Sequence, residues 1–362
     1  MTRKIRVLLG GYINSIQAQD LNCRALAMFL DKSKFDVSAF LVPQEFRDFE
    51  IGDEMDDVNL IQLNRPAKLL WYWIYLKGII NCDVAYLPKG QKRHWCKFLC
   101  KLFGKKTFTT VEGVMDKETL SGCVKAYGSE NDVRKVYNMW DKTFSITKFM
   151  ASRNYSSIGI QSDGVLYLGV DTSLFKIDNK PQKTKGEPFD FIFIGTDIKR
   201  KRLNEFLDLA KLFPDDRFHI VGGNEGCDVF QFLGYEHLKN VKFHGRLNHS
   251  ELAKLLKNMN LHIFPSRSEG FPKVTLETAA AGVPSIVYSD YGASEWINSG
   301  ENGYVVERFE EIVDILNDLK SNPDKLRSLS ENAISMAARF DWKSVVKDWE
   351  SMIEELYMSD KK

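Results

Sequence analysis

The stretch LHIFPSRSEGFPKVTLETAAAGVPSIVY, residues 261–288, decides the fold because it holds a complete strand, loop, helix and second strand. The first strand is the short apolar run Leu261 to Pro265. Pro272 suits a first helical position, where its fixed φ favours the helix and its missing N–H is no loss. Thr275 to Ala281 contains strong helix formers, and a glycine and a proline follow as stop signals. Ser285 to Tyr288 then reads as a second buried strand.

Two carboxylates, Glu269 and Glu277, lie around the N-terminus of this predicted helix. A helix N-terminus presents unpaired N–H groups and a partial positive charge, which together form a seat for phosphate. Carboxylates there accept hydrogen bonds from hydroxyl groups but repel a bare phosphate. A ligand whose phosphates are flanked by polyols satisfies both preferences, and a nucleoside diphosphate sugar is such a ligand. One carboxylate would bind the ribose hydroxyls and the other the sugar hydroxyls, while the helix end faces the diphosphate.

The run from Phe264 to Val306 also resembles the donor-site signature of glycosyltransferase family 4, whose hallmark is Glu, seven residues, Glu. The resemblance extends to Gly270-Phe271, Gly282-Val283-Pro284, Gly292 to Glu295 and Gly303. Members of that family are retaining enzymes with the GT-B fold. The resemblance therefore implies a retaining glycosyltransferase that uses a nucleotide sugar as its donor.

Strand-like and helical patterns alternate along the whole chain, which is typical of parallel doubly wound sheets. The expected strands are Ile5–Leu9, Val37–Val42, Asn59–Leu63, Val84–Leu87, Thr107–Val111, Thr143–Ile146 and Val165–Tyr167, then Phe189–Ile194, Phe218–Val221, Val241–Phe243, Leu261–Phe264 and Ser285–Tyr288. The polar segment Lys176 to Pro188 separates the two sets and is the best candidate linker. We expect an acceptor-side Rossmann-like domain over residues 1–175, a donor-binding Rossmann-like domain over 176–340, and a terminal helix within 341–362 that packs back on the first domain. This is an α/β fold of GT-B type, in which two doubly wound domains face a central cleft.

The composition excludes several classes of protein. Of the 362 residues, 44% are apolar and 27% charged, as in soluble globular proteins. A net charge of +1 argues against a nucleic-acid partner. The N-terminus turns polar too soon for a signal peptide, and no apolar run approaches the roughly 18 residues of a membrane-spanning helix. The cysteines are scattered, so we expect free thiols in the cytoplasm. The histidines lack metal-ligand spacing and no Asp-x-Asp element is present, so we expect neither a metal nor a cofactor.

Four consecutive cations, residues 199–202, follow a predicted strand and its terminal glycine. Hydrogen bonds from charged groups contribute about 1.5–3 kcal/mol each, and cations here would stabilise the charge that develops on a departing diphosphate. In the resembled family this loop supplies an Arg directly after the glycine and a Lys about five residues later. Lys201 matches that Lys, whereas Thr196 stands at the Arg position, so Arg200 or Arg202 is expected to substitute. A solvated helix start is the alternative, and it is disfavoured because basic residues there oppose the helix dipole.

Further candidates are glycines after strands and one acidic residue. Gly222 and Gly245 follow strands at places where the family brings loops close to the nucleotide, although glycine after a strand is as often simple turn chemistry. Gly10-Gly11 follow the first predicted strand and would let a ligand approach the backbone closely. Glu112 ends a strand where family members commonly have a His. It would contact the donor sugar or serve as an acid/base group, or else be a solvated turn residue.

The full set of candidate site residues falls into two groups. Those expected to act in catalysis are Glu269, Lys201, Arg200 and Glu112, and those expected to bind the donor are Gly10, Gly11, Gly195, Arg202, Gly222, Gly245, Arg246, Leu247, Gly270, Phe271, Pro272, Lys273, Val274 and Glu277. The resemblance assigns the ribose hydroxyls to Glu277 and the transferred sugar to Glu269. The N–H groups of Phe271, Lys273 and Val274 are expected to be free to face phosphate or sugar.

The segment 92–106 combines an apolar stripe with six Lys and Arg residues. Its stripe recurs at helical spacing and consists of Trp95, Phe98, Leu99, Leu102 and Phe103. In a doubly wound domain such a stripe usually covers the sheet, so burial is the favoured interpretation. The alternative is a basic amphipathic helix that lies on anionic lipid at the inner face of a membrane, which would suit a lipid-linked acceptor.

The sequence therefore predicts a retaining, metal-independent hexosyltransferase. It would move a sugar from a nucleotide-diphosphate sugar to a glycan or lipid-linked glycan, in polysaccharide or glycoconjugate synthesis. One alternative is a non-catalytic sugar-nucleotide-binding subunit, because Thr196 and Glu112 depart from the family pattern. A second is a GT-B-fold epimerase, which would convert the nucleotide sugar without an acceptor.

Overall fold

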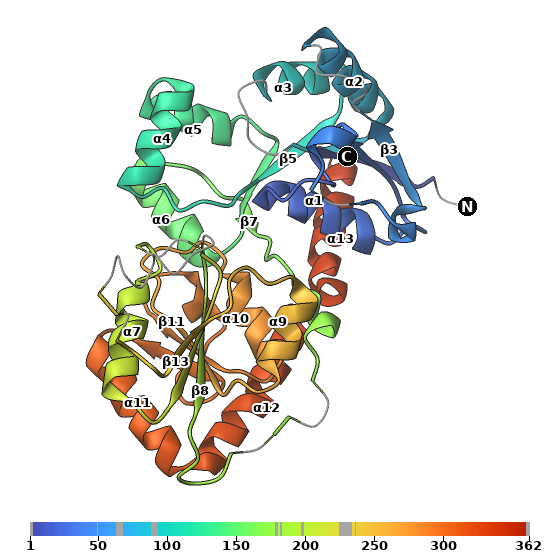
Figure 1. Cartoon of the computed structure of the whole chain (residues 1–362). Helices are drawn as coiled ribbons and strands as arrows, with labels where there is room; N and C mark the ends of the chain where they lie inside the picture. Colours follow the sequence, from blue (N-terminus) through green and yellow to red (C-terminus); the bar gives the residue numbers. More distant parts are fainter. Residues whose placement is uncertain are drawn as a thin grey trace. The chain divides into compact units, whose positions relative to one another are not determined.

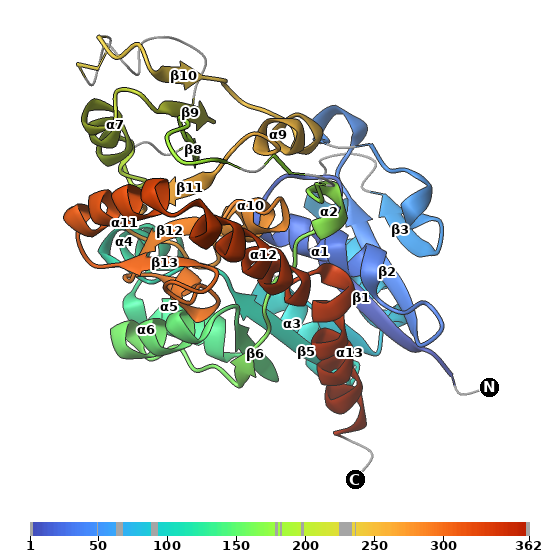
Figure 2. The ribbon, with the colours of Figure 1, turned by 90° about the horizontal axis from the view of Figure 1, so that it is seen from below.

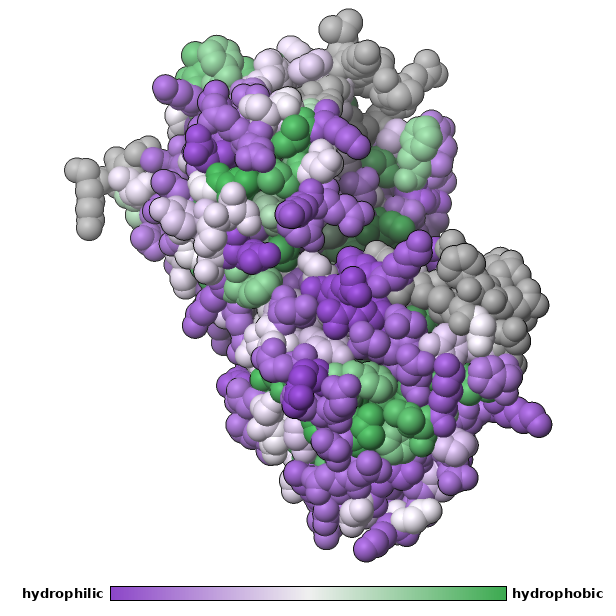
Figure 3. Space-filling model, turned by 90° about the vertical axis from the view of Figure 1, so that its left-hand side faces the viewer, coloured by the Kyte–Doolittle hydropathy of each residue, from purple (hydrophilic) through white to green (hydrophobic). Residues whose placement is uncertain are grey.

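The chain forms two compact α/β units in the computed structural model. The structure describes residues 3–48, 50–62, 68–87, 93–177, 180–181, 183–196, 199–223, 234–235 and 237–359, with the side chains of 68–70 and 93 left aside. The first unit comprises residues 1–168 together with 342–362, and the second comprises 169–341. On the face shown in Figure 3, hydrophilic residues cover most of the surface and hydrophobic residues gather in a few small areas.

The first unit is built on a seven-stranded sheet with strand order β3-β2-β1-β4-β5-β6-β7 (Figure 1). Every neighbouring pair of strands is parallel. The strands are β1 (Ile5–Tyr12), β2 (Phe35–Leu41), β3 (Val58–Gln62), β4 (Val84–Tyr86), β5 (Lys106–Val111), β6 (Lys142–Ser145) and β7 (Gly164–Val165). The helices are α1 (Ala18–Phe29), α2 (Lys68–Asn81), α3 (Arg93–Leu102), α4 (Lys117–Tyr127), α5 (Glu130–Asn138), α6 (Lys148–Ile158) and α13 (Trp342–Met358), with short 3₁₀ turns η1 (Gln44–Phe46) and η2 (Asp53–Met55).

The second unit has a six-stranded parallel sheet with strand order β10-β9-β8-β11-β12-β13. Its strands are β8 (Asp190–Ile194), β9 (Arg217–Val221), β10 (Val241–Phe243), β11 (Leu261–Phe264), β12 (Ser285–Tyr288) and β13 (Gly303–Val306). Its helices are α7 (Leu203–Leu212), α9 (His249–Leu256), α10 (Lys273–Ala280), α11 (Phe309–Ser321) and α12 (Pro323–Arg339), with 3₁₀ turns η3 (Thr172–Leu174) and η4 (Gly292–Glu295). The central strands are short apolar runs because helices cover both faces of the sheet. Helix α10 packs against α12 (Figure 2).

The chain passes from the first unit to the second between Leu168 and Gly169. The sequence analysis placed this boundary after residue 175. It lies earlier because Val170 is already tied to the end of the second unit, where its N–H donates to the carbonyl of Phe340 at 3.0 Å. The hydroxyl of Thr172 likewise donates to the carboxylate of Asp341 at 2.5 Å.

The terminal helix α13 packs on α1, and both helices belong to the first unit. The rings of Phe29 and Trp342 are stacked with centroids 6.3 Å apart. The indole N–H of Trp349 donates to the carbonyl of Tyr167 at 2.9 Å. Helix α13 is therefore held by both apolar packing and a partly buried hydrogen bond.

The expected strands and the alternating architecture are confirmed, with ends that shift by one to three residues. The exceptions are β7, which is shorter than expected, and β13, which sequence reasoning did not identify as a strand. In β13, Gly303 lies so close to β12 that a Cβ atom would stand 2.6 Å from the carbonyl oxygen of Ser285. The glycine weakens the β-strand pattern in the sequence, yet it is the residue that lets the edge strand pair.

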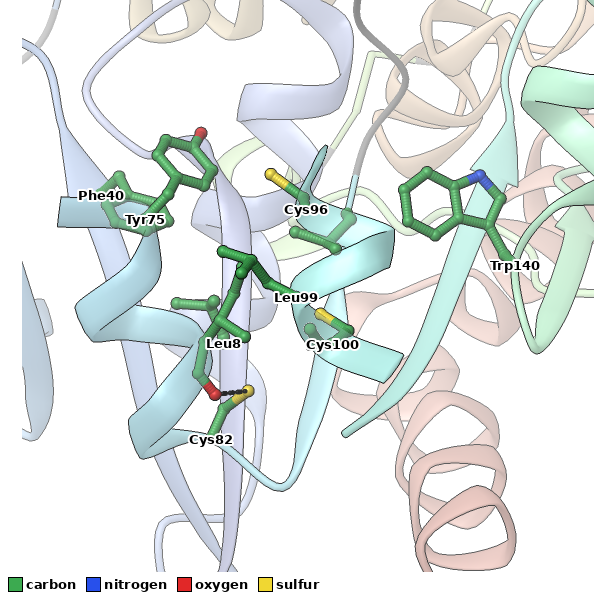
Figure 4. Packing of buried hydrophobic residues seen from close by; sticks show 11 residues of the cluster. Leu8, Phe40, Tyr75, Cys82, Cys96, Leu99, Cys100 and Trp140 are labelled. Carbon is green, nitrogen blue, oxygen red and sulfur yellow. Dashed lines mark hydrogen bonds between the residues drawn. The ribbon is translucent and has the colours of Figure 1, made fainter. Parts of the chain in front are cut away.

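The expectation that the apolar stripe of α3 is buried is confirmed only in part, because Leu99 is buried and Trp95 is half-buried against the core. The inner face of the helix also includes Cys96 and Cys100, which belong to the same core cluster as Leu8 and Cys82 (Figure 4). Phe98, Leu102 and Phe103 are 62%, 64% and 40% exposed. Small thiols allow the helix to approach the sheet closely, and the larger side chains are consequently left on the outer side.

Candidate functional site

The strand order of the second unit creates a switch point between β8 and β11. The chain leaves β8 through α7 towards β9 on one side, whereas the neighbour of β8 on the other side is β11. In open parallel sheets, ligands bind outside the carboxyl ends of the strands at such a point. The residues that follow β8 include Arg200 and Lys201, and those that follow β11 include Ser266 and Glu269. The sequence-predicted cations and the first predicted acid therefore meet at the expected end of the sheet.

Glu269 is the centre of this cluster. Its Oε1 atom accepts a hydrogen bond from Arg200 Nη1 at 2.6 Å and lies 3.4 Å from Lys201 Nζ. The hydroxyl of Ser266 donates to the same oxygen at 2.9 Å. The Glu269 side chain is only 14% exposed, so these contacts operate in a partly desolvated setting. Ser266 was not predicted, although its position three residues before Glu269 in the same loop was visible in the sequence.

Glycines bring the loops after β8, β9 and β10 into close contact. A Cβ atom on Gly195 would lie 2.2 Å from Cδ of Lys201, so this side chain runs directly over the glycine. Gly222 has φ of +104°, and a Cβ there would lie 2.3 Å from the carbonyl oxygen of Gly195. Its N–H donates to the carbonyl of Gly245 at 2.7 Å. At Gly222 the glycine is therefore required both by the positive φ and by the close approach of backbone, whereas at Gly195 it makes room for the Lys201 side chain.

Glu277 lies in the second turn of α10 and is half-buried. Burial raises the pKa of its carboxyl group, and the positive charges of His249, Lys273 and Lys201 oppose that rise. Lys201 thus acts electrostatically on Glu277 and also lies near Glu269. The amine of Lys201 therefore interacts electrostatically with both predicted acids, Glu269 and Glu277.

The N-terminus of α10 differs in detail from the prediction. The helix begins at Lys273, and Pro272 is the N-cap residue with φ of −75° and ψ of 84°. These angles are close to an inverse γ-turn, in which the Lys273 N–H donates to the carbonyl of Phe271 at 2.9 Å. The expectation that this amide is free is therefore wrong. The hydrogen bond of a three-residue turn is poorly aligned and hence weak, so a stronger acceptor can replace it.

The other residues of this loop have separate environments. The ring of Phe271 packs on Trp296 with centroids 4.9 Å apart, so its side chain belongs to the core and only its backbone is available to a ligand. Gly270 and Val274 are partly exposed on either side of it.

Arg202 takes a different direction from Arg200. It has left-handed backbone angles, φ 49° and ψ 49°, as the N-cap of α7. Its guanidinium lies over the ring of Tyr288, 4.6 Å from the centroid, and near Glu205 and Asp290 at 3.7 and 3.6 Å. Of the two arginines left open by the sequence, Arg200 is the one in contact with Glu269. Thr196, at the position where the family has Arg, is exposed.

The loop after β10 carries three further predicted residues. Gly245 has φ of +67° with open space around its Cα, so its role is to shape the turn. Arg246 is exposed, and Leu247 is half-buried beside it. These residues lie at the carboxyl edge of the same sheet as the cluster around Glu269.

In the first unit, Gly10 and Gly11 lie within β1 rather than after it. The hydroxyl of Tyr75 donates to the Gly10 carbonyl at 2.9 Å. A Cβ on Gly11 would lie 2.8 Å from Oδ1 of Asp20, which accepts the N–H of Tyr12 at 2.8 Å. The register of β1 shifts between Leu9 and Tyr12, and Asp20 of α1 holds this end of the strand. Gly11 is therefore explained by its close packing against α1.

Glu112 follows β5 and is not a solvated turn residue. Its Oε1 atom accepts hydrogen bonds from the hydroxyl of Thr110 at 2.8 Å and from that of Tyr86 at 3.1 Å. Tyr86 is fully buried, and its pKa is raised by burial and by the nearby carboxylate. Its contact with a sugar or role as an acid/base group stays a prediction.

Within the described ranges, no three His, Cys, Asp or Glu side chains come together as a set of metal ligands. The expectation of a metal-free reaction stays a prediction. No helix in the described parts of the chain combines the length and the apolarity needed to span a bilayer.

The chain is similar to several glycosyltransferases. Residues 175–336 match the family Glycosyl transferases group 1. An uncharacterized glycosyltransferase of Methanocaldococcus jannaschii is 24% identical over 223 residues, 60% of each chain. The capsular polysaccharide biosynthesis glycosyltransferase CapM of Staphylococcus aureus is 26% identical over 155 residues, 41% of this chain and 40% of CapM. The match therefore spans about half the length of these relatives.

Among solved structures, HepE of Anabaena in complex with UDP and glucose superposes with a TM-score of 0.70 at 16% identity, covering 97% of this chain and all of that one. Two parallel-sheet Rossmann-like units with such a neighbour define a GT-B fold. The match to the family Glycosyl transferases group 1 lies within the second unit.

Proposed function

We propose that this chain is a retaining glycosyltransferase that transfers a hexose from a nucleotide-diphosphate sugar to a glycan or lipid-linked glycan. The observation that carries the proposal is the cluster of Glu269 with Arg200 and Lys201 at the β8–β11 switch point, next to the start of α10. Two cations suit a diphosphate, and two carboxylates suit the hydroxyls on either side of it.

Each residue has a distinct role in this proposal. Glu277 binds the ribose hydroxyls, and Glu269 binds the transferred sugar. Lys201 and Arg200 exchange their contact with Glu269 for the diphosphate and stabilise its charge as the sugar leaves. The backbone N–H groups at the start of α10 face the phosphates, and for Lys273 this requires release of the γ-turn bond to Phe271. No metal or cofactor takes part, because the cations supply the charge that a metal would otherwise provide.

The comparisons support the substrate class. HepE was crystallised with UDP and glucose, and CapM is named for capsular polysaccharide synthesis. A uridine diphosphate hexose is therefore the first donor to test, with a polysaccharide precursor as the acceptor.

The test measures binding and turnover separately. Thermal unfolding is followed with UDP, ADP, GDP and their hexose derivatives, because a ligand of the native state raises its apparent stability. Glu277→Ala should remove the shift caused by the matching nucleotide, and Asp314→Asn, an exposed charge on α11, should leave it unchanged. Nucleotide release with an acceptor extract should persist in EDTA. Loss of turnover in EDTA with recovery on addition of manganese would contradict the metal-free proposal.

A second candidate is a sugar-nucleotide-binding subunit without activity of its own. The observation that favours it is the exposed Thr196 at the position where the family has Arg. Binding of a nucleotide sugar without release of nucleotide under any acceptor condition supports the subunit. Conversion of the nucleotide sugar in the absence of an acceptor supports an epimerase instead.

A further inference from the structure

Helix α2 exposes an apolar face on the side opposite its buried residues. Tyr75 and Ile79 are fully buried in the core, whereas Trp73 is 66% exposed and Ile80 is 43% exposed. Trp73, Ile80 and Leu76 line one shallow hollow on the outer side of the helix. A single exposed apolar side chain is common on protein surfaces, but several together mark a candidate interaction site.

Helix α3 carries a second apolar face of the same kind. Phe98 and Leu102 are one helical turn apart and more than 60% exposed, while Cys96 and Cys100 on the other side are fully buried. Phe103 continues the exposed face beyond the end of the helix.

The two exposed faces are neighbours. Helices α2 and α3 contact each other, and Figure 1 shows them side by side. The Trp95 ring meets Tyr72 edge-on at 4.8 Å and lies 6.2 Å from Trp71. Leu102 is seven residues after Trp95 and hence lies on the same side of α3, the side that faces α2. Trp73 and Ile80 of α2 and Phe98 and Leu102 of α3 are thus exposed on neighbouring helices, and we call these four side chains the α2–α3 face.

The charge of this part of the chain is strongly one-sided. Residues 64–110 contain ten Lys and Arg and a single acid, Asp83, although the net charge of the whole chain is only +1. Asp83 is occupied by Arg6 and Arg3 at 2.7 and 3.0 Å. Lys77 of α2 and Lys101 of α3 are exposed beside the apolar residues. The α2–α3 face thus combines apolar side chains with positive charge, and helices α2 and α3 themselves contain no carboxylate.

The combination of apolar side chains and positive charge favours one binding partner of the α2–α3 face over another. A second copy of the chain would bring two positive faces together, which like-charge repulsion disfavours. A bilayer that contains anionic lipid accepts the apolar side chains among its acyl chains and the amines among its headgroups. We propose that the α2–α3 face binds the surface of an anionic bilayer, with Trp73, Phe98 and Leu102 inserted and Lys77 and Lys101 at the phosphates.

The experiment measures sedimentation of the full-length protein with vesicles. One set contains equal parts of phosphatidylglycerol and phosphatidylcholine, and the other contains phosphatidylcholine alone. We expect the partition coefficient to be at least about tenfold higher for the anionic vesicles and to fall in about 0.5 M NaCl. The double variant Phe98→Ala/Leu102→Ala should lose about tenfold or more of its binding.

Matched control variants show whether vesicle binding depends on the α2–α3 face or on exposed apolar side chains in general. Tyr155 of α6 and Leu212 of α7 are 63% and 56% exposed, so Tyr155→Ala/Leu212→Ala removes a similar area elsewhere and should leave binding unchanged. Lys77→Glu/Lys101→Glu should weaken binding to the anionic vesicles alone. All variants should keep the unfolding temperature and the nucleotide-induced shift of the wild type, which keeps this test independent of the proposed function.

Three results would overturn the proposal. These are equal sedimentation of the wild type with both vesicle sets, no loss of binding in the α2–α3 variants, or a dimer in analytical ultracentrifugation that Phe98→Ala/Leu102→Ala dissociates. The last result would assign the face to a second copy of the chain.

Discussion

Replacement of Glu269 by Gln removes one negative charge from the site and preserves its shape. We expect this variant to bind free nucleoside diphosphate more tightly than the wild type does, even though it loses activity. In the unliganded protein, the Glu269 carboxylate holds Arg200 at 2.6 Å and lies 3.4 Å from Lys201. A diphosphate has to share these cations with the carboxylate and also experiences its repulsion. A glutamine amide removes both effects.

The magnitude follows from the geometry of the cluster. A phosphate on the two cations would lie about 5 Å from the carboxylate, and at an effective dielectric constant of about 40–60 the repulsion is about 1–2 kcal/mol. The nucleoside diphosphate should therefore bind about tenfold more tightly to Glu269→Gln. The gain should be smaller for the sugar nucleotide, because the variant also loses an acceptor for a sugar hydroxyl. Turnover should fall by about a hundredfold or more, since transition-state stabilisation is lost.

Isothermal titration calorimetry with the nucleotide identified by the thermal-shift screen measures this difference. Asp314→Asn, which also removes one negative charge from the second unit, is the control and should bind like the wild type. High salt should reduce the gain in affinity, because it screens a charge that is only partly buried. Unchanged or weaker diphosphate binding by a folded Glu269→Gln protein would refute the assignment of Arg200 and Lys201 to the diphosphate.

Three further predictions test the surroundings of the site. Gly222→Ala should lower the thermal stability by more than Gly300→Ala does. Both positions have positive φ, which costs about 1–2 kcal/mol of strain each for alanine, but only at Gly222 would the new Cβ meet a backbone oxygen, at 2.3 Å. Equal losses would count against the close approach of the loops. Arg200→Ala should reduce turnover strongly with little change in the unfolding temperature. Arg202→Ala should chiefly lower the unfolding temperature, because the Arg202 guanidinium packs on the ring of Tyr288. The reverse pattern in assays of turnover and unfolding would exchange the roles of the two arginines. Burial lowers the pKa of Lys180 to about 7. Above that pH the unfolded chain therefore binds more protons than the native one, and the contribution of Lys180 to the free energy of unfolding should rise from about pH 7 to about pH 10.5. In chemical denaturation, the free energy of unfolding of Lys180→Met should depend less on pH in this range than that of the wild type.

The arrangement of residues around Glu269 could be predicted because its pieces are local in sequence. The strand, loop and helix around Glu269 and Glu277 are specified within residues 261–288, and parallel topology then brings the loop after β8 to the same sheet edge. The choice between Arg200 and Arg202 could not be made in this way. It depends on a left-handed residue at Arg202 that turns one side chain towards Tyr288 and leaves the other at Glu269.

The error in α3 has a different physical origin. The predicted stripe is Trp95, Phe98, Leu99, Leu102 and Phe103, but Cys96, Leu99 and Cys100 form a second apolar stripe that shares Leu99 with it. Periodicity shows that both stripes are apolar and does not show which one faces the sheet. Size would have favoured the aromatic stripe, whereas Cys96 and Cys100 are the fully buried residues. The same limit applies to Pro272, where the γ-turn that precedes α10 depends on backbone angles that the sequence pattern leaves open.

The contact of Glu269 with Arg200 and Lys201 also bears on selectivity against the commonest anions of a cell. An empty pair of cations would attract inorganic phosphate and sulfate, which are abundant and carry no hydroxyl chains. Here the two cations already have a counter-ion in Glu269, so a small anion would gain little by binding to them. Under the proposed function, a ligand that offers hydroxyls to the displaced carboxylate together with phosphates for the cations would compensate for the exchange, and the protein would thereby favour the whole donor over its fragments.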